Sequence, residues 1–374
     1  MPRATASTAL PLTFLALGRR GPTPRLALEL AQAAIGGSRI DARFAISSAS
    51  ELAPRLTALG SRVFTLDTFA RPNPLAVIGN YHAARRQLLQ RLEADRPAAV
   101  VTVMPHVWTP LLAPAIRRLG IRYATIVHDV SAHPGDASGV VTRWLLRETR
   151  TADLMIALSE AIAGQLVGRL GVPREKVLRL FHPDLTYDST PAIRRRAPGA
   201  PLRLLFFGRI MAYKGLSLLI DALEALRREG VAVRLGVAGS GRIGPEWRRL
   251  AALDAEIINR WIDDAEVGPL LARYDAVAAA HVEASQSGVV AAAFGQRMPV
   301  VAMPVGGIPE QVIDGERGVL APAITAPALA DAIRRLALDP ALYERISAHL
   351  HATAPQRATA TFIDKLAERL EKLA

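Results

Sequence analysis

The chain of 374 residues contains no cysteine, which excludes disulfide bonds, a catalytic thiolate and any metal site with cysteine ligands. It also contains no run of about 20 apolar residues, so we expect no membrane-spanning helix. The first residues lack the charged, apolar and small-residue succession of a secretory signal, and we expect a cytoplasmic protein. Peripheral contact with the inner face of the cell membrane stays open at this stage.

Lysine and aromatic residues are both scarce, which limits what the net charge of +12 can mean. Only four of the 46 basic residues are lysines, and aromatic residues make up 5% of the chain. No basic stripe interleaved with aromatic residues occurs, so we expect no nucleic-acid partner. Phosphate groups or an acidic membrane surface suit the surplus of arginine better. The arginines of 81–96 and 142–150 offer such a face, although ordinary solvated helix faces are the plainer alternative.

Hydrophobic residues account for half of the chain, enough for the cores of two domains. Short continuous apolar runs alternate with longer amphipathic ones, which predicts parallel sheets covered by helices on both faces. The expected strands lie at 11–18, 43–48, 62–66, 98–104, 122–129, 153–159, 202–208, 233–240, 255–262, 275–280 and 299–305.

The alternation is interrupted once, by a segment rich in proline and arginine. We therefore predict an α/β protein with two Rossmann-like domains whose parallel sheets face a central cleft. The predicted domains are 1–186 and 202–354, joined by a linker at 187–201 and followed by an amphipathic helix at 355–374 that packs back on the first domain. Ligands of such sheets bind beyond the carboxyl ends of the strands, so cleft residues should follow strands.

Two cations, Arg209 and Lys214, follow the strand expected at 202–208, and Gly215 then opens an amphipathic helix. A strand–turn–helix unit with two cations suits an anion, because the helix N-terminus adds unpaired N–H groups. Ordinary solvated loop charges are the plainer alternative. The rarity of lysine in this chain singles out Lys214.

A second candidate turn is "EASQSGVV", which begins at Glu283. Gly288 lets the backbone approach a ligand closely, and the N–H groups of Ser287, Gly288 and Val289 would point from a helix start toward negative charge. Glu283 can accept hydrogen bonds from sugar hydroxyls. The alternative is a plain Ser287 cap on the following helix, with Glu283 at the surface.

Other candidates also follow expected strands. His128 and Asp129 end the strand at 122–129, where His128 either donates to a sugar hydroxyl or phosphate or is a satisfied core histidine. Gly21 lies in the first strand–helix turn, and His106 follows the strand at 98–104. Glu310 lies on a short helix after a pair of glycines, where tight packing is the plainer explanation of the motif.

Three segments, "FFGRIMAYKGLSLLIDALEAL", "VAGSG" and "RYDAVAAAHVEASQSGVVAAAFGQRMPVVAMPVGGIPEQVIDGERGVLAP", resemble the family 4 glycosyltransferases, which are retaining enzymes of the GT-B architecture. The resemblance is dense at 202–322 and sparser in "IVHDVSAHPGD", "ADLMIALSEAIAGQL" and "LFHP". It implies a nucleotide-sugar donor on the C-terminal domain and an acceptor on the N-terminal one. It implies neither a metal nor another cofactor.

The resemblance also implies roles for four residues as a catalytic set. Arg209 and Lys214 match the family's cationic pair on the donor diphosphate, where they stabilise the leaving charge. Glu283 matches an acid that contacts the donor sugar, and His128 matches the cleft histidine that faces it. Retention is then explained by front-face attack in which the departing phosphate accepts the acceptor's proton. No separate base is needed, in contrast to retaining glycosidases with their carboxylate pair.

The chain departs from the family pattern at the second motif acid, because the expected position holds Ala291. The motif E-x-x-Q-S-G-V resembles that of a subgroup in which this acid is replaced, and Gln286 and Ser287 are then expected to share its polar role. Trp261 and Ile262 complete the expected donor contacts, together with the glycine turns described above.

Three functions compete at this stage. The leading one is a transferase that moves a sugar from a nucleotide donor to a hydroxyl of a saccharide or lipid-linked acceptor, in the assembly of surface polysaccharide or glycolipid. The second is a nucleotide-sugar epimerase or hydrolase of the same architecture. The third is a non-catalytic subunit that has lost a site acid, against which the retention of the four-residue catalytic set argues.

Overall fold

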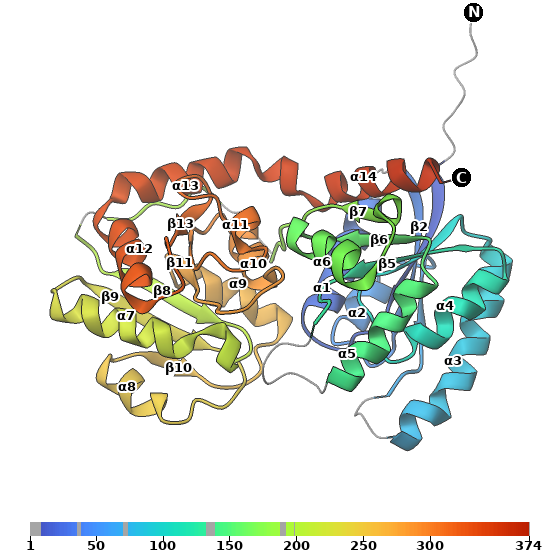
Figure 1. Cartoon of the computed structure of the whole chain (residues 1–374), viewed down its shortest axis with the longest axis horizontal. Coiled ribbons are helices and arrows are strands. Elements are labelled where there is room, and N and C mark those ends of the chain that lie inside the picture. Colours follow the sequence, from blue (N-terminus) through green and yellow to red (C-terminus); the bar gives the residue numbers. More distant parts are fainter. Residues whose placement is uncertain are drawn as a thin grey trace, which may run out of the picture.

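The computed structural model describes residues 9–35, 39–69, 74–131, 139–187, 192–197 and 199–373, with the side chains of 74–76 left aside. These residues form two α/β domains, each built around one parallel sheet (Figure 1). The two-domain parallel architecture predicted from the alternation of apolar runs is therefore confirmed. Part of the predicted linker, 188–191 and 198, lies outside the described residues.

The N-terminal sheet has seven parallel strands in the order β3-β2-β1-β4-β5-β6-β7. Its strands are β1 (Leu10–Ala16), β2 (Ile40–Ser47), β3 (Val63–Leu66), β4 (Ala99–Thr102), β5 (Arg122–Val127), β6 (Leu154–Ala157) and β7 (Val177–Arg179). The inner strands are buried on both faces, as expected of a parallel sheet between helix layers. Neighbouring strands are tied by side-chain stacking as well, since the rings of Phe14 and Phe44 lie 5.1 Å apart.

Helices cover both faces of this sheet and begin at the carboxyl ends of its strands. They are α1 (Pro22–Ile35), α2 (Ala53–Thr57), α3 (Pro74–Asp95), α4 (Thr109–Arg118), α5 (Gly139–Leu145) with its 3-10 continuation η1 (Leu146–Arg150), α6 (Glu160–Leu170) and the short η2 (Arg174–Lys176). The end of α6 is set by Gly171, which adopts a left-handed conformation.

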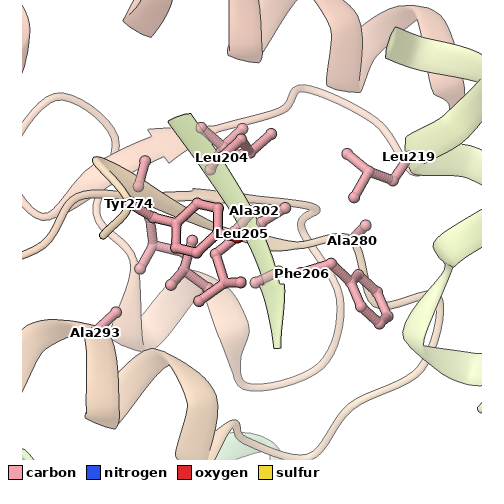
Figure 2. Packing of buried hydrophobic residues seen from close by; sticks show 14 of the residues in the cluster. Leu204, Leu205, Phe206, Leu219, Tyr274, Ala280, Ala293 and Ala302 are labelled. Atoms are coloured by element: carbon pink, nitrogen blue, oxygen red, sulfur yellow. The ribbon is translucent and has the colours of Figure 1, made fainter. Parts of the chain in front are cut away.

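The C-terminal sheet has six parallel strands in the order β10-β9-β8-β11-β12-β13. The strands are β8 (Leu202–Phe207), β9 (Val233–Ala238), β10 (Glu256–Ile258), β11 (Ala276–Ala279), β12 (Val300–Ala302) and β13 (Gly318–Leu320). The helices between them are η3 (Ala212–Lys214), α7 (Leu216–Arg228), α8 (Glu246–Ala252), α9 (Asp264–Ala272), α10 (Gly288–Gly295) and α11 (Ile308–Gln311). Figure 2 shows side chains of β8 packed among those of α7, α10 and β12 in the core of this domain.

The chain ends in a helical stretch that returns to the N-terminal domain. It consists of α12 (Ala326–Leu338), α13 (Pro340–Ala352), η4 (Ala354–Arg357) and α14 (Thr359–Glu371). Phe362, Leu366 and Leu370 of α14 are buried in the core of the N-terminal domain, beside α1 (Figure 1). Buried Arg357 at the crossing donates from Nε to Asp184 at 3.1 Å. The last helix thus ties the two domains together.

Both sheets reverse their strand order at one point, between β1 and β4 and between β8 and β11. A ligand crevice forms at such a point, outside the carboxyl ends of the strands. In this chain the two crevices face each other across the domain boundary, which places the candidate site.

Candidate active site

A cavity of about 510 Å³ lies between the two domains, at the carboxyl ends of the two sheets. Its wall is formed by the turns that follow β1, β5, β8, β10 and β11 and by the start of α10. Of the residues predicted to act in the cleft, those that line this cavity are Gly21, His128, Asp129, Arg209, Lys214, Trp261, Ile262, Gln286, Ser287, Gly288 and Val289.

Arg209 and Lys214 form a cationic wall of the cavity. The exposed Arg209 donates from Nη2 to the hydroxyl of Tyr213 at 3.0 Å. Nζ of the half-buried Lys214 lies 2.8 Å from Nε2 of His281, which accepts because an ammonium can only donate. The same Nζ lies 5.2 Å from the centre of the Tyr213 ring. Two cations held at one wall by neighbouring side chains give this part of the cavity a positive potential.

The turn that carries Lys214 is fixed by Gly215. This glycine has φ +70° and precedes α7, and a side chain there would overlap the carbonyl oxygen of Ala280 at the end of β11. Only glycine adopts this conformation without strain and leaves room for the strand behind it. The backbone of the turn therefore lies directly against β11, and the Lys214 side chain reaches His281 from there.

Helix α10 begins at the cavity with a serine cap. The Ser287 hydroxyl accepts from the N–H of Val290 at 3.5 Å, while the N–H of Ser287 is occupied by Oε1 of Gln311 at 2.7 Å. Gly288 and Val289 occupy the first two positions of the helix, where N–H groups have no partner within the helix. Both residues line the cavity, so these two amides are the ones available to an anion.

Two buried histidines, His128 and His182, lie close to the start of α10. Nε2 of His128 donates to the carbonyl of Val103 at 3.1 Å, and its Nδ1 accepts from the side-chain amide of Gln286 at 3.2 Å. Burial lowers the pKa of His128, against the opposing charge of Asp129. Burial also lowers the pKa of His182 to about 4. Both imidazoles are therefore neutral near pH 7, a state in which one ring nitrogen donates a hydrogen bond and the other accepts one.

Glu51 links the two domains at the far end of the cavity. Its carboxylate accepts from the N–H of Gly21 at 2.8 Å and from Nε1 of Trp261 at 3.2 Å. The Arg20 guanidinium lies 5.6 Å from the centre of the Trp261 ring. Burial raises the pKa of Glu51 above its ordinary value, and the two hydrogen bonds oppose that effect. The first glycine turn is thus joined to the loop after β10, although 210 residues separate Glu51 from Trp261.

Other cavity carboxylates are held by hydrogen bonds and ion pairs. Asp129 accepts from the hydroxyl of Ser285 across the domain boundary. Asp264 at the start of α9 pairs with Arg25 and Arg55 of the N-terminal domain, each at 3.0 Å. These contacts connect the two domains on both sides of the cavity.

Three predicted residues are not among those that line the cavity: Glu283, His106 and Glu310. Glu283 is half-buried in the loop between β11 and α10. His106 stacks on Phe69 with a ring separation of 5.4 Å, and burial together with the charge of Arg19 lowers its pKa to about 4. His106 thus belongs to an aromatic cluster of the N-terminal domain.

Glu310 caps a helix of the other domain. Its carboxylate accepts from the N–H groups of Glu160 and Ala161 at 2.7 and 3.1 Å, at the start of α6, and pairs with Arg179 at 3.2 Å. A carboxylate is favoured at a helix N-terminus because the N–H groups there are unpaired and carry partial positive charge. Glu310 therefore bridges the domains beside the cavity.

The position of the missing motif acid is buried. Ala291 is 1% exposed, its carbonyl accepts from the N–H of Leu185 at 3.1 Å, and it is not a lining residue. The next residue, Ala292, does line the cavity. This wall of the cavity is therefore apolar where an acid would otherwise lie.

Several lining residues had no counterpart in the sequence analysis, chiefly His182, His281, Glu51 and Asp264. His281 and His182 each lie close to a motif that was identified, "DAVAAAHVEASQSG" and "LFHP". Their position near strand ends was a usable signal. Glu51 and Asp264 carried none, because their partners lie in the other domain.

Among the described residues, no group of three or more histidine, aspartate or glutamate side chains is placed to hold a metal ion. No helix in the described part of the chain has the length and apolar content needed to cross a membrane.

Comparisons with known proteins agree with this architecture. The family model for glycosyl transferases group 1 matches residues 201–339, and that for the glycosyl transferase 4-like domain matches 23–180. The chain is 26% identical over 311 residues to the alpha-D-kanosaminyltransferase of Streptomyces kanamyceticus, covering 75% of this chain and 76% of that protein. It is 30% identical over 293 residues to the glycogen synthase of Mycobacterium tuberculosis, covering 73% and 68%.

Solved structures share the fold at lower identity. Anabaena HepE in complex with UDP-glucose superposes with a TM-score of 0.71 at 18% identity, covering 98% of this chain and all of that one. Sucrose-phosphate synthase from Thermosynechococcus elongatus gives a TM-score of 0.70 at 17% identity, with coverage of 98% and 100%. The chain therefore belongs to the group 1 family of glycosyl transferases and has the GT-B fold of two facing Rossmann-like domains.

Proposed function

We propose that this glycosyltransferase is a retaining enzyme that moves a sugar from a nucleotide-sugar donor to a hydroxyl acceptor. The observation that carries the proposal is the cationic wall: Arg209 and Lys214 line the interdomain cavity from one turn. The N–H groups of Gly288 and Val289 lie at the same cavity. Together they suit a diphosphate, whose negative charge grows as the sugar leaves.

In the proposed reaction the acceptor oxygen bonds to the anomeric carbon on the face from which the phosphate oxygen departs. The bond between that carbon and the phosphate breaks with its electron pair on the phosphate. The acceptor's proton passes to the departing phosphate, so the step needs no protein base. His128 and His182 hydrogen-bond the sugar, His128 in exchange for its bond to Gln286. Their lowered pKa makes both imidazoles weak bases, so they do not take the acceptor's proton.

The nucleotide part is proposed to bind toward Trp261 and Ile262, which line the cavity beyond the phosphate-binding turns. HepE was solved in complex with UDP-glucose, which makes a UDP-sugar the first donor to test. The acceptor then enters from the N-terminal domain. We further propose that it is a saccharide or lipid-linked hydroxyl used in surface polysaccharide or glycolipid synthesis, at the cytoplasmic side of the membrane.

A thermal-shift screen with UDP-, GDP- and ADP-sugars tests the donor site, because a ligand that binds only the folded chain raises its melting temperature. Arg209→Met and Lys214→Met should each weaken donor binding about 10-fold or more, as expected for loss of a charged hydrogen bond. The exposed Arg248 on α8 supplies the control, Arg248→Met, which should bind like the native chain. Equal donor affinity in all four proteins would refute the proposal.

The product distinguishes the transferase from the alternatives. NMR of the anomeric proton, with donor and a hydroxyl acceptor, should show transfer with the donor's configuration kept. Conversion of the donor without any acceptor, into an epimer or a free sugar, would instead identify an epimerase or a hydrolase. Donor binding without turnover in the presence of a broad acceptor set would favour a non-catalytic subunit.

A further inference from the structure

Helices α3, α4 and α5 form one layer on the N-terminal domain, and each exposes an aliphatic residue near its N-terminus (Figure 1). The exposed fractions are 65% for Ile78, 44% for Leu111 and 72% for Val140. Helix α5 has no buried residue at all, although four of its seven residues are apolar. This part of the domain therefore leaves apolar surface uncovered.

Hydrogen bonds bring these three helix starts together around Val107 and Trp108. The indole of Trp108 donates to the carbonyl of Val77 at 3.0 Å, next to Ile78. The indole of Trp144, one turn beyond Val140, donates to the carbonyl of Val107 at 2.8 Å. Leu111 follows Trp108 by three residues in α4. The three exposed aliphatic residues therefore lie around one place, where the hydrogen bonds of the two indoles join the three helices.

Each aliphatic residue is followed seven positions later by an arginine: Arg85, Arg118 and Arg147. Within α3 and α4, residues seven apart lie on the same helix face, about 10 Å apart along the axis, while Arg147 lies in η1, beyond the end of α5. Burial raises the pKa of Tyr81 while the charges of Arg85 and Arg118 lower it, so both guanidinium groups face the space around Tyr81. Ile78, Leu111 and Val140 therefore form an aliphatic row near the helix starts. Arg85, Arg118 and Arg147 form an arginine row farther along the layer.

Acidic residues are few in this layer. Helix α3 has two, Glu93 and Asp95, both in its last turn, α4 and α5 have none, and the only acid of η1, Glu148, is buried. Six arginines of the layer form no ion pair with any residue in the described part of the chain: Arg85, Arg86, Arg118, Arg143, Arg147 and Arg150. Exposed arginines of the C-terminal domain are divided: Arg260 and Arg273 pair with carboxylates, whereas Arg228 and Arg248 form no ion pair in the described part of the chain.

We propose that the exposed face of α3–α5 docks on an anionic lipid bilayer. The aliphatic row enters the boundary between headgroups and acyl chains, and the arginine row lies at the level of the phosphates. The helix starts point to the carboxyl edge of the sheet, the same edge at which the cavity opens. Docking would therefore present the cavity to a lipid-linked acceptor, a consequence that rests on the function proposed above.

Vesicle co-sedimentation with the full chain tests the surface. The chain should bind vesicles of phosphatidylcholine mixed with phosphatidylglycerol and not those of phosphatidylcholine alone, and salt should weaken the binding. Arg118→Glu with Arg147→Glu, two exposed residues of the arginine row, should weaken it at least about 25-fold, since one arginine near an anionic surface contributes about fivefold. Arg228→Glu with Arg248→Glu changes the charge equally on exposed sites of α7 and α8 and should bind as the native chain does.

Ile78→Ser with Val140→Ser tests the aliphatic row separately and should leave only weak, salt-sensitive binding. Donor-induced thermal shifts of every variant should match those of the native chain, which separates this inference from the donor site. Native binding that ignores lipid charge, equal losses in the two charge-reversal pairs, or unchanged binding of the Arg118/Arg147 pair would each overturn the proposal. Tight binding to an RNA oligonucleotide without vesicle binding would overturn it in favour of a nucleic-acid partner.

Discussion

Glu148 lies buried under α4 with 1% of its surface exposed, and its ionisation should make the stability of the chain depend on pH. One carboxylate oxygen accepts from the Thr125 hydroxyl, while Oε2 is buried without a hydrogen-bond partner among the described residues. Burial raises the pKa of Glu148 from 4.5 to about 7. Since a pKa difference of one between the folded and unfolded chain corresponds to 1.36 kcal/mol, Glu148 changes the free energy of unfolding by about 3 kcal/mol in total.

The sign follows from which state binds the proton more tightly. The folded chain does, because its pKa is the higher one, so the contribution is complete below about pH 4.5 and is lost as the pH rises through about 7. Urea unfolding of the native chain and of Glu148→Gln, measured at several values between about pH 5 and pH 8, isolates this residue. The stability of the variant relative to the native chain should rise by about 2 to 3 kcal/mol across this range. A constant difference between the two proteins would refute this account of Glu148.

Three further predictions concern the cavity. Gly215→Ala should lower both the melting temperature and donor affinity well beyond Gly230→Ala, because both glycines have positive φ but only Gly215 has backbone against it; equal effects would contradict the argument. Donor binding should show no ionisation of His182 above about pH 5, and a transition near pH 6.5 that disappears in His182→Asn would be evidence against its burial. Gln286→Ala and Ser287→Ala should each weaken donor binding about fivefold, in a calorimetric titration, and unchanged affinity in both would exclude their polar role.

Local patterns predicted the parts of the fold that local forces decide. Strands such as β1, β5 and β8 are continuous apolar runs bounded by polar turns, and burial on both faces requires that pattern. The edge strands β7 and β13 were not predicted; each has only three residues and takes its strand geometry from the neighbouring strand. The equally short edge strand β10 was predicted because it lies within a longer strand-like stretch, 255–262.

The same distinction applies to the candidate site. Arg209 and Lys214 follow a strand within a few residues, so chain order alone places them at the sheet edge. Glu51 and Asp264 gain their roles from partners more than 200 residues away, such as Trp261 and Arg55, and no local pattern carries that information. Long-range packing also determines where the side chains of the predicted residues point.

His106 follows a strand, as a cleft residue should, but Phe69 and Trp108 enclose it in an aromatic cluster. Glu310 belongs to a glycine motif at the cleft, yet its carboxylate is used to cap α6. In both cases the residue lies near the sheet edge, as its place after a strand indicates. The direction of its side chain, however, is decided by packing against another element.

The most direct test of the central claim is a crystal structure of the chain with the nucleotide sugar that gives the largest thermal shift. The account predicts diphosphate oxygens within hydrogen-bond distance of the Arg209 guanidinium, the Lys214 ammonium and the N–H groups of Gly288 and Val289. A diphosphate bound elsewhere in the cavity, with neither the Arg209 guanidinium nor the Lys214 ammonium in contact with it, would contradict it.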